Sequence, residues 1–299
     1  MMKFDIIGKR KIWYIVSILI ILPGIFSMCT QGFNLGIDFT GGVLIDLEFH
    51  KPVTVVEVRE VLKDYGLDNS MIQLAGAENG ISSKNVMIRT ADLEETQKRD
   101  VLDALKNQIG DYDVLRTERV GAVMGSELTL QAIGATLLSW VLIVAYISYR
   151  FELKFAIAAI LGLIHDIFIV LGIFSLFQIE IDATFVAALM TIIGYSTNDT
   201  IVIFDRIREN LKLHYRKGGD LVQLADTSIW QTMTRSIYTV LTVLFATAAL
   251  YWFGGDTTKN FSFALLIGFT SGAYSSIFTS TPLWVTFRHY SDKKRATQA

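Results

Sequence analysis

The chain has 299 residues, of which 52% are hydrophobic and 12% aromatic, and its formal net charge is −2. This apolar content exceeds that of most soluble domains and makes a membrane protein the first class to consider, while the small negative charge gives no support to nucleic-acid binding. A single cysteine, Cys29, excludes an intrachain disulfide and a multi-cysteine metal site, and the four histidines lack the HxxxH spacing of zinc hydrolases. We therefore expect no metal and no cofactor.

Six apolar, nearly uncharged stretches follow one another along the chain, each of the roughly 17 to 25 residues that a helix needs to cross a bilayer. They are residues 12–28, 128–149, 155–177, 183–204, 229–253 and 261–287. Basic residues precede the first stretch as they would in a signal peptide, but its apolar core is long and no small-residue cleavage site follows, so we interpret it as a retained anchor. The fold class expected is a membrane all-α protein with a bundle of six transmembrane helices.

Basic residues are concentrated in alternate connections between these stretches. The N-terminus, residues 150–154, residues 205–217 and the C-terminal tail are rich in Lys and Arg, whereas residues 178–182 carry none and residues 254–260 only Lys259. Because short cytoplasmic loops are enriched in Lys and Arg, we expect both termini in the cytoplasm and residues 29–127 on the opposite side of the membrane. The predicted organisation is 1–28 with the first helix, 29–127 as an extracytoplasmic domain, 128–287 with five helices, and 288–299 as a cytoplasmic tail.

The segment 29–127 is long enough to form a folded domain. Its apolar pattern alternates between strand and helix periods, with turn residues such as Gly66, Asn79-Gly80 and Gly110 between the elements. The predicted elements are strand 43–49, helix 54–65, strands 71–74 and 86–89, helix 93–109 and strand 112–120. This β-α-β-β-α-β order predicts an α+β ferredoxin-like domain. Beyond the fourth span, residues 205–227 continue the helical pattern to a turn at Gly218-Gly219, which we interpret as a helix at the membrane surface.

Ionisable groups inside the spans are the candidates for function, because each costs roughly 2.5 to 3.5 kcal/mol at the helix centre even on a lenient scale. Three sites qualify: His165-Asp166, Asn198-Asp199 and Arg235. A rise of ~1.5 Å per residue places Asp199 and Arg235 at a similar depth, each about 9 Å inside its span. They are either a structural ion pair or parts of a proton pathway. His165 and Asp166 are either packed, hydrogen-bonded groups or, with Asn198, further parts of the proton pathway.

Small residues form a stripe along the sixth span at four-residue spacing. Gly268, Gly272, Ser276 and Ser280 share one helix face, and such a face allows another helix to approach closely. We interpret the stripe as a helix-packing surface.

Three sequence motifs carry a resemblance to a known family. They are GIDFTGG at residues 36–42, GYSTNDT at 194–200 followed by VIFDRIREN at 202–210, and YSSIF at 274–278. They resemble the signatures of the SecF family, accessory subunits of the bacterial Sec protein-export machinery that are grouped with the proton-driven transporters of the resistance-nodulation-division type. The resemblance covers essentially the whole chain.

The resemblance implies a non-enzymatic function. The chain would act with SecD and the Sec translocation channel complex, in contact with membrane lipid, and use the proton-motive force to promote the passage of unfolded preproteins. It also implies that Asp199 carries the proton with Arg235 as its partner, and that Gly36, Asp38, Gly41, Gly42, Asp205 and Arg206 are family motif residues. Thr197 and Ala122 depart from the usual pattern; the second replaces a common proline and leaves the entry to the second span less rigid.

Other readings remain open at the level of sequence. An intramembrane aspartyl protease would use Asp166 and Asp199 as a pair sharing one proton, although a cation near Asp199 argues against it. A stand-alone efflux pump would need no partner. The three glycines of 36–42 suit a tight chain reversal, and no lysine follows that would favour a phosphate-binding loop. The coupling ion could be a proton or sodium.

Overall fold

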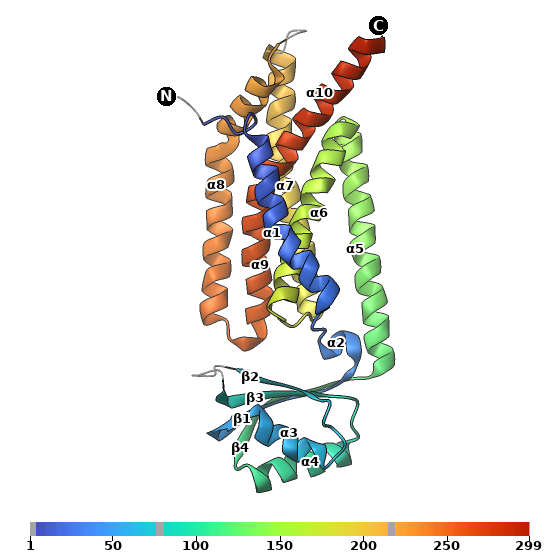
Figure 1. The fold of residues 1–299 in the computed structure, drawn as a ribbon, viewed down its shortest axis with the longest axis vertical. Helices are drawn as coiled ribbons and strands as arrows, with labels where there is room; N and C mark the ends of the chain where they lie inside the picture. Colours follow the sequence, from blue (N-terminus) through green and yellow to red (C-terminus); the bar gives the residue numbers. More distant parts are fainter. Residues whose placement is uncertain (1–3, 76–80, 215–218, 299) are drawn as a thin grey trace. The chain divides into compact units, whose positions relative to one another are not determined.

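The computed structural model describes residues 4–75, 81–214 and 219–298, and it divides into two units. One comprises the chain up to Asn34 and from Gly134 onward, and the other comprises Leu35–Ile133. These limits reflect internal packing; the functional boundaries at 29 and 127 stay predictions. Figure 1 shows the elements of each unit along the chain.

The larger unit is helical. Its helices are α1 (Arg10–Thr30), the part of α5 (Ala122–Arg150) from Gly134 onward, α6 (Leu153–Leu176), α7 (Ala183–His214), α8 (Leu221–Phe253), α9 (Asp256–Ser275) and α10 (Thr281–Gln298). Six helical stretches in the described residues are long and apolar enough to cross a membrane, the sixth running through α9 and α10 from Thr257 to Ser291. The predicted six-helix membrane fold is therefore confirmed, and the chain is a multi-pass membrane protein.

The helices differ in how much of their surface they bury within the chain. In the most apolar 18-residue stretch of α6, 56% is buried within the chain, against 6% in the corresponding stretch of α5. Helix α6 is therefore central, and α5 presents most of its side chains outward. Helix α6 can be central because small residues such as Ala158, Ala159 and Gly162 let its neighbours approach. A compact apolar cluster around Phe155, Phe204 and Trp284 joins α6, α7 and α10.

Two features of the helical unit differ from the sequence prediction. The last span is interrupted by a π-helical turn at Ser276–Ser280, which the apolar periodicity of the sequence did not predict. Such turns occur mostly inside longer helices and often at functional sites. The stretch 205–227 forms no separate surface helix in the described residues: α7 continues through it to His214, and α8 starts at Leu221, capped by the side chain of Asp220. The predicted turn residue Gly218 lies outside the described residues.

The smaller unit contains a four-stranded antiparallel sheet in the order β2-β3-β1-β4. Its elements are α2 (Ile37–Thr40), β1 (Gly42–Thr54), α3 (Val55–Lys63), β2 (Met71–Ala75), β3 (Ser82–Thr90), α4 (Glu95–Gln108) and β4 (Tyr112–Val120). The predicted β-α-β-β-α-β order is confirmed, with α3 and α4 side by side on one face of the sheet (Figure 1). The predicted turn at Asn79-Gly80 lies outside the described residues.

Local chemistry explains where these elements begin. Helix α3 starts at a capping box, in which Thr54 and Glu57 each satisfy the other's backbone N–H. Alternate residues of β1, including Ile45 and Leu47, are fully buried beneath the helices, as the period of two requires. Strand β1 is longer than predicted because it runs past an irregularity in its pairing with β3, between Glu48 and Val53.

The GIDFTGG segment forms one helical turn, α2, and then enters β1. Gly41 and Gly42 have φ angles of +71° and +123°, which residues other than glycine rarely adopt. A Cβ on Gly42 would collide with the carbonyl oxygen of Thr90, and one on Gly125 would lie 2.9 Å from the amide nitrogen of Gly41. The glycines therefore allow both the reversal and a close backbone contact with the start of α5.

Candidate functional site

Asp199 lies on α7 and is almost completely buried, with 8% of its surface exposed. Its Oδ1 accepts a hydrogen bond of 2.7 Å from the hydroxyl of Ser236 on α8. Its Oδ2 has no hydrogen-bond partner among the residues that the structure describes. A buried carboxylate with an unsatisfied oxygen is costly, so this group needs either a proton or a further donor.

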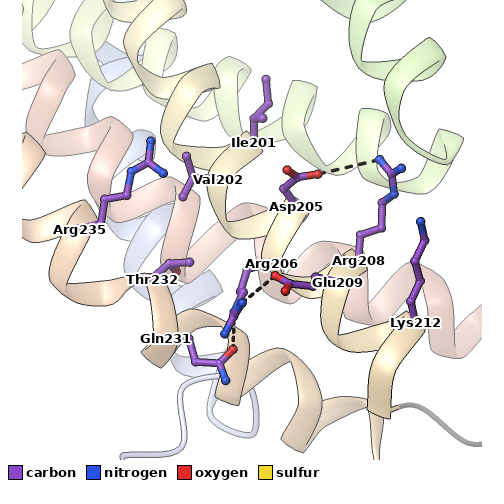
Figure 2. Close-up of a pocket in the computed structure, with 10 residues that line it drawn as sticks. All are labelled: Ile201, Val202, Asp205, Arg206, Arg208, Glu209, Lys212, Gln231, Thr232 and Arg235. Carbon is purple, nitrogen blue, oxygen red and sulfur yellow. Dashed lines mark hydrogen bonds and ion pairs between the residues drawn. The ribbon is translucent and has the colours of Figure 1, made fainter.

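Arg235 precedes Ser236 on α8, and its side chain is exposed. Within the described chain, no hydrogen bond or ion pair of 4.0 Å or less joins it to Asp199, although it is near enough to attract the carboxylate electrostatically. Figure 2 shows Arg235 beside Val202, at the edge of a cavity of about 740 Å³. Asp199 and Arg235, which the sequence predicted at a similar depth, are therefore neighbours, but within the described chain no direct hydrogen bond or ion pair joins them.

Asp166 on α6 has the opposite environment. It is fully buried, and four donors surround its carboxylate. Oδ1 contacts His165 Nδ1 at 3.0 Å and the Ser271 hydroxyl at 2.7 Å. Oδ2 accepts from the hydroxyls of Ser196 at 2.6 Å and Ser275 at 2.7 Å. Both oxygens are satisfied, and the hydrogen bonds join α6 to α7 and α9.

His165 extends this network to α1. Its Nε2 lies 3.1 Å from the hydroxyl of Ser17, which also donates to the hydroxyl of Tyr274 at 3.3 Å. Tyr274 in turn donates to the backbone carbonyl of Trp13 at 3.0 Å. We call the set Ser17, His165, Asp166, Ser196, Ser271 and Ser275 the Asp166 network. It connects four helices, and α8 is not one of them.

The first three residues of the stripe on the last span face α7, whereas Ser280 lies against Gly162 of α6. A Cβ on Gly268 would collide with Ile192, and one on Gly272 would lie 3.0 Å from the Cβ of Ser196. One turn further, the hydroxyls of Ser276 and Thr200 are 2.8 Å apart. Residues 268, 272 and 276 thus meet residues 192, 196 and 200, and both sets repeat every four residues. Asn198 is exposed on α7, unlike its neighbour Asp199.

The motif residues Asp205 and Arg206 lie near the end of α7, within the group of charges that Figure 2 shows around the cavity. Arg206 donates to Gln231 on α8 and to Glu209, both at 2.6 Å. Asp205 lies 3.5 Å from Arg150 and 3.9 Å from Arg208. Asp38 belongs to α2 in the smaller unit, Gly36 and Gly41 are the caps of that helix, and Gly42 begins β1. The site residues of the sequence analysis therefore fall into separate groups.

Serines of the site were missed by the sequence analysis. Ser236 is the donor to Asp199, while Ser196, Ser271 and Ser275 surround Asp166. The signal that could have indicated them is the rule that a buried carboxylate must find donors, combined with the spacing of Ser271 and Ser275, which are one helical turn apart on the last span.

The geometry disfavours a carboxylate pair for proteolysis. Every hydrogen-bond partner of Asp166 is a serine or a histidine, and Asp199 is not among them. Two carboxylates that share one proton would have to contact each other. The motif at 36–42 also offers no lysine side chain for a phosphate-binding loop.

Two family models match the chain. "Protein export membrane protein SecD/SecF, C-terminal" matches residues 100–290, and "SecD/SecF GG Motif" matches residues 26–53. The protein translocase subunit SecF of Acidaminococcus fermentans is 51% identical over 289 residues, which cover 96% of this chain and 98% of that protein. The chain belongs to the SecF family. The SecF of Haemophilus influenzae is 40% identical over 273 residues, covering 91% of this chain and 82% of that protein.

Solved structures agree with this assignment to the SecF family. The crystal structure of SecDF from Thermus thermophilus, a translocon-associated membrane protein, matches with a TM-score of 0.87 and 32% identity. The match covers 96% of this chain and 39% of the SecDF chain. This SecF-family chain therefore corresponds to about two fifths of that longer protein, and it is a protein translocase subunit like its relatives.

Proposed function

We propose that the chain is the SecF half of a two-part protein-export device in the bacterial cytoplasmic membrane. Its partner would be SecD, because the SecDF chain from Thermus thermophilus contains a matching region within a much longer protein. Both termini lie in the cytoplasm and the ferredoxin-like domain lies outside, according to the distribution of Lys and Arg. Together with the translocation channel, the pair acts on unfolded preproteins.

Proton movement through Asp199 drives the device. The observation that carries this step is the unsatisfied Oδ2 of a carboxylate buried within a membrane span. A proton on that oxygen removes the cost of a buried charge, and its loss is favoured when Arg235 approaches. One charge crossing ~200 mV supplies about 4.6 kcal/mol, close to the ~5.5 kcal/mol that moves a two-state equilibrium from 1:99 to 99:1.

The Asp166 network has a different task in this proposal. Because hydrogen bonds satisfy all of its carboxylate oxygens, Asp166 needs no proton from outside. It holds α1, α6, α7 and α9 as one block, against which α8, with Arg235 and Ser236, can shift. The device has no catalytic residue of its own, and transport of protein rather than bond cleavage is its output.

Asp199→Asn tests the proposal. The amide keeps the size of the side chain and a hydrogen bond to Ser236 but cannot exchange a proton. We expect the variant to insert and to associate with SecD. The rate of export that an imposed proton gradient stimulates in membrane vesicles should fall at least tenfold. Asp182→Asn is the matched control, since Asp182 caps the other end of α7 through the amide of Phe185 and Asn also caps helices.

Two results would contradict the proposal. Normal gradient-stimulated export by Asp199→Asn would exclude the carboxylate as the carrier. Stimulation of the parent protein by a sodium gradient alone, at equal proton concentration on both sides, would replace the proton with sodium as the coupling ion.

A further inference from the structure

A second charged cavity lies beside the connection between α5 and α6. This connection, Phe151–Glu152, is only two residues long. Since it joins two helices that can each cross a membrane, it must lie at a membrane surface, where the headgroups of lipids are found. The cavity has a volume of about 490 Å³, and its lining includes Phe155 from α6, Arg208, Leu211 and Lys212 from α7, and Arg288 from α10.

Positive charge exceeds negative charge around this cavity. Four cations line it, Arg150, Arg208, Lys212 and Arg288, and among the described lining residues Glu152 is the one carboxylate, which pairs with Arg288 at 2.7 Å. Asp205 lies nearby, but it is shared by Arg150 and Arg208 at the long distances of 3.5 and 3.9 Å. Among the described residues that line the cavity, together with Asp205, four cations therefore face two carboxylates.

The geometry concentrates these cations instead of separating them. The guanidinium carbons of Arg150 and Arg208 lie 5.5 and 5.7 Å from the centre of the same ring, that of Phe151. Lys212 follows Arg208 by one turn of α7, and the two side chains project from the same side of that helix in Figure 2. Lys212 forms no ion pair with any residue in the described ranges. Asp205 offsets part of the repulsion between Arg150 and Arg208, and a further anion would offset the rest.

We propose that this cavity binds the phosphate of an anionic phospholipid. Arginine forks match the paired oxygens of a phosphate group, and basic pockets between membrane helices on the cytoplasmic side bind lipid headgroups. Leu211, which is partly exposed, supplies an apolar wall along which the first carbons of an acyl chain can pack. This site lies outside the Asp199 and Asp166 groups, and its occupancy does not depend on proton coupling.

The site makes a lipid a structural ligand of the helix ends. A bound phosphate would bridge α5, α7 and α10, which already meet here through the Arg150–Asp205 pair at 3.5 Å, the hydrogen bond from Arg208 to the carbonyl oxygen of Arg150 at 3.1 Å, and the pair of Arg288 with Glu152 at 2.7 Å. An anion that binds the folded state alone stabilises it by RT ln(1 + L/Kd), where L is the free anion concentration, so the unfolding temperature rises once this concentration exceeds Kd.

The experiment uses the full chain in a neutral detergent, with native mass spectrometry and thermal unfolding as the readouts. The probes are phosphatidylglycerol, phosphatidylcholine and inorganic phosphate at equal concentration. We expect phosphatidylglycerol to remain bound and to raise the unfolding temperature, while the other two do neither. Equal protection by inorganic phosphate would overturn the lipid as the ligand, and equal binding of phosphatidylcholine would overturn the role of charge.

A double variant, Arg208→Gln with Lys212→Gln, tests the site itself. We expect at least a tenfold weaker affinity for phosphatidylglycerol. The matched control is Lys9→Gln with Lys11→Gln, which removes two positive charges elsewhere on the helical unit and should keep the affinity. The single variant Lys212→Gln changes an exposed side chain without an ion pair, so it preserves the fold and should weaken binding several-fold. Unchanged affinity in Lys212→Gln and in the double variant would overturn the proposal.

Discussion

At the scale of single residues, the chain contains two buried carboxylates with opposite hydrogen bonding. Asp166 accepts from three serines and contacts a histidine, whereas Asp199 has one hydroxyl donor and one oxygen without a partner in the described chain. A carboxylate with four donors is stabilised in place, and one with a vacant oxygen is suited to exchange. The same residue type therefore serves structure at one position and, in our proposal, coupling at the other.

This contrast predicts that stability and activity separate between the two positions. Asp166→Asn places an NH2 donor against hydroxyls that now lack an acceptor, so we expect unfolding to become easier by about 1–3 kcal/mol. Asp199→Asn should leave the thermal unfolding temperature in detergent nearly unchanged while it abolishes gradient-stimulated export. A lower unfolding temperature for Asp199→Asn than for Asp166→Asn would contradict this assignment.

In the ferredoxin-like domain, the start of α3 depends on pH. Hydrogen bonds from the backbone N–H and the hydroxyl of Thr54 lower the pKa of Glu57 below its usual value. A lowered pKa in the folded state means that the contribution is complete above the ordinary pKa of 4.5 and is lost as the pH falls through the lowered value. The capping box is thus a feature of the domain at neutral pH.

Thr54→Ala removes the hydroxyl of this capping box. At neutral pH we expect it to destabilise the helix by about 1 kcal/mol, measured as faster amide hydrogen exchange in Val55–Lys63 of the full chain. The difference from the parent protein should shrink only as the pH falls through the lowered pKa of Glu57, where the carboxylate that accepts from Thr54 becomes protonated. Thr54→Ser keeps the hydroxyl and serves as the control; a Ser variant as fast as the Ala variant would exclude the cap as the cause.

At the scale of elements, helix contacts depend on small residues at crossing points. Helices α1 and α6 cross at Gly24 and Gly172, where a Cβ on Gly24 would lie 2.7 Å from the Cα of Gly172. Near this crossing, the hydroxyls of Ser27 and Ser175 are 2.9 Å apart. The contact of His165 with Ser17 belongs to the same pair of helices. The close approach at the glycines is what brings these polar pairs within reach.

Gly172→Val should separate α1 from α6. The added branch cannot fit against the backbone of Gly24, and overpacking of this kind costs about 1–3 kcal/mol. We expect a lower unfolding temperature and weaker disulfide formation between cysteines placed at Ser27 and Ser175. Gly134→Val on α5 is the control, because a Cβ there meets nothing within 4 Å; an equal loss of stability in both variants would exclude the helix crossing as the cause.

At the scale of the whole molecule, much of the apolar surface of the helices is left uncovered by the chain itself. Only 17% of the most apolar 18-residue stretch of α8 is buried within the chain, against 56% in α6. Lipid can cover an apolar face, but Arg235 on α8 is exposed within a membrane span. A charged group at that depth is normally directed to a protein neighbour or to water. We therefore propose that the partner binds the side of α8 that carries Arg235.

A photo-crosslinking residue at Tyr238, which is exposed one turn beyond Arg235 on α8, should capture SecD when both proteins are produced together. The same residue at Leu142 on α5, which is also exposed but has no charged neighbour in its span, should give lipid adducts. Capture of SecD from Leu142 and not from Tyr238 would move the partner surface away from α8.

The sequence by itself determined the six spans, the order of strands and helices in the small domain, and the identity of the ionisable residues in the membrane. Apolar length, period and rare charges are local properties, so they can be read without coordinates. Only the tertiary structure decided which serine reaches which carboxylate, that Arg235 stands beside Asp199 without pairing to it, and that the last span contains a π-helical turn. Serines are common in membrane helices, and a hydrogen bond between helices depends on rotation and crossing, which no single segment specifies.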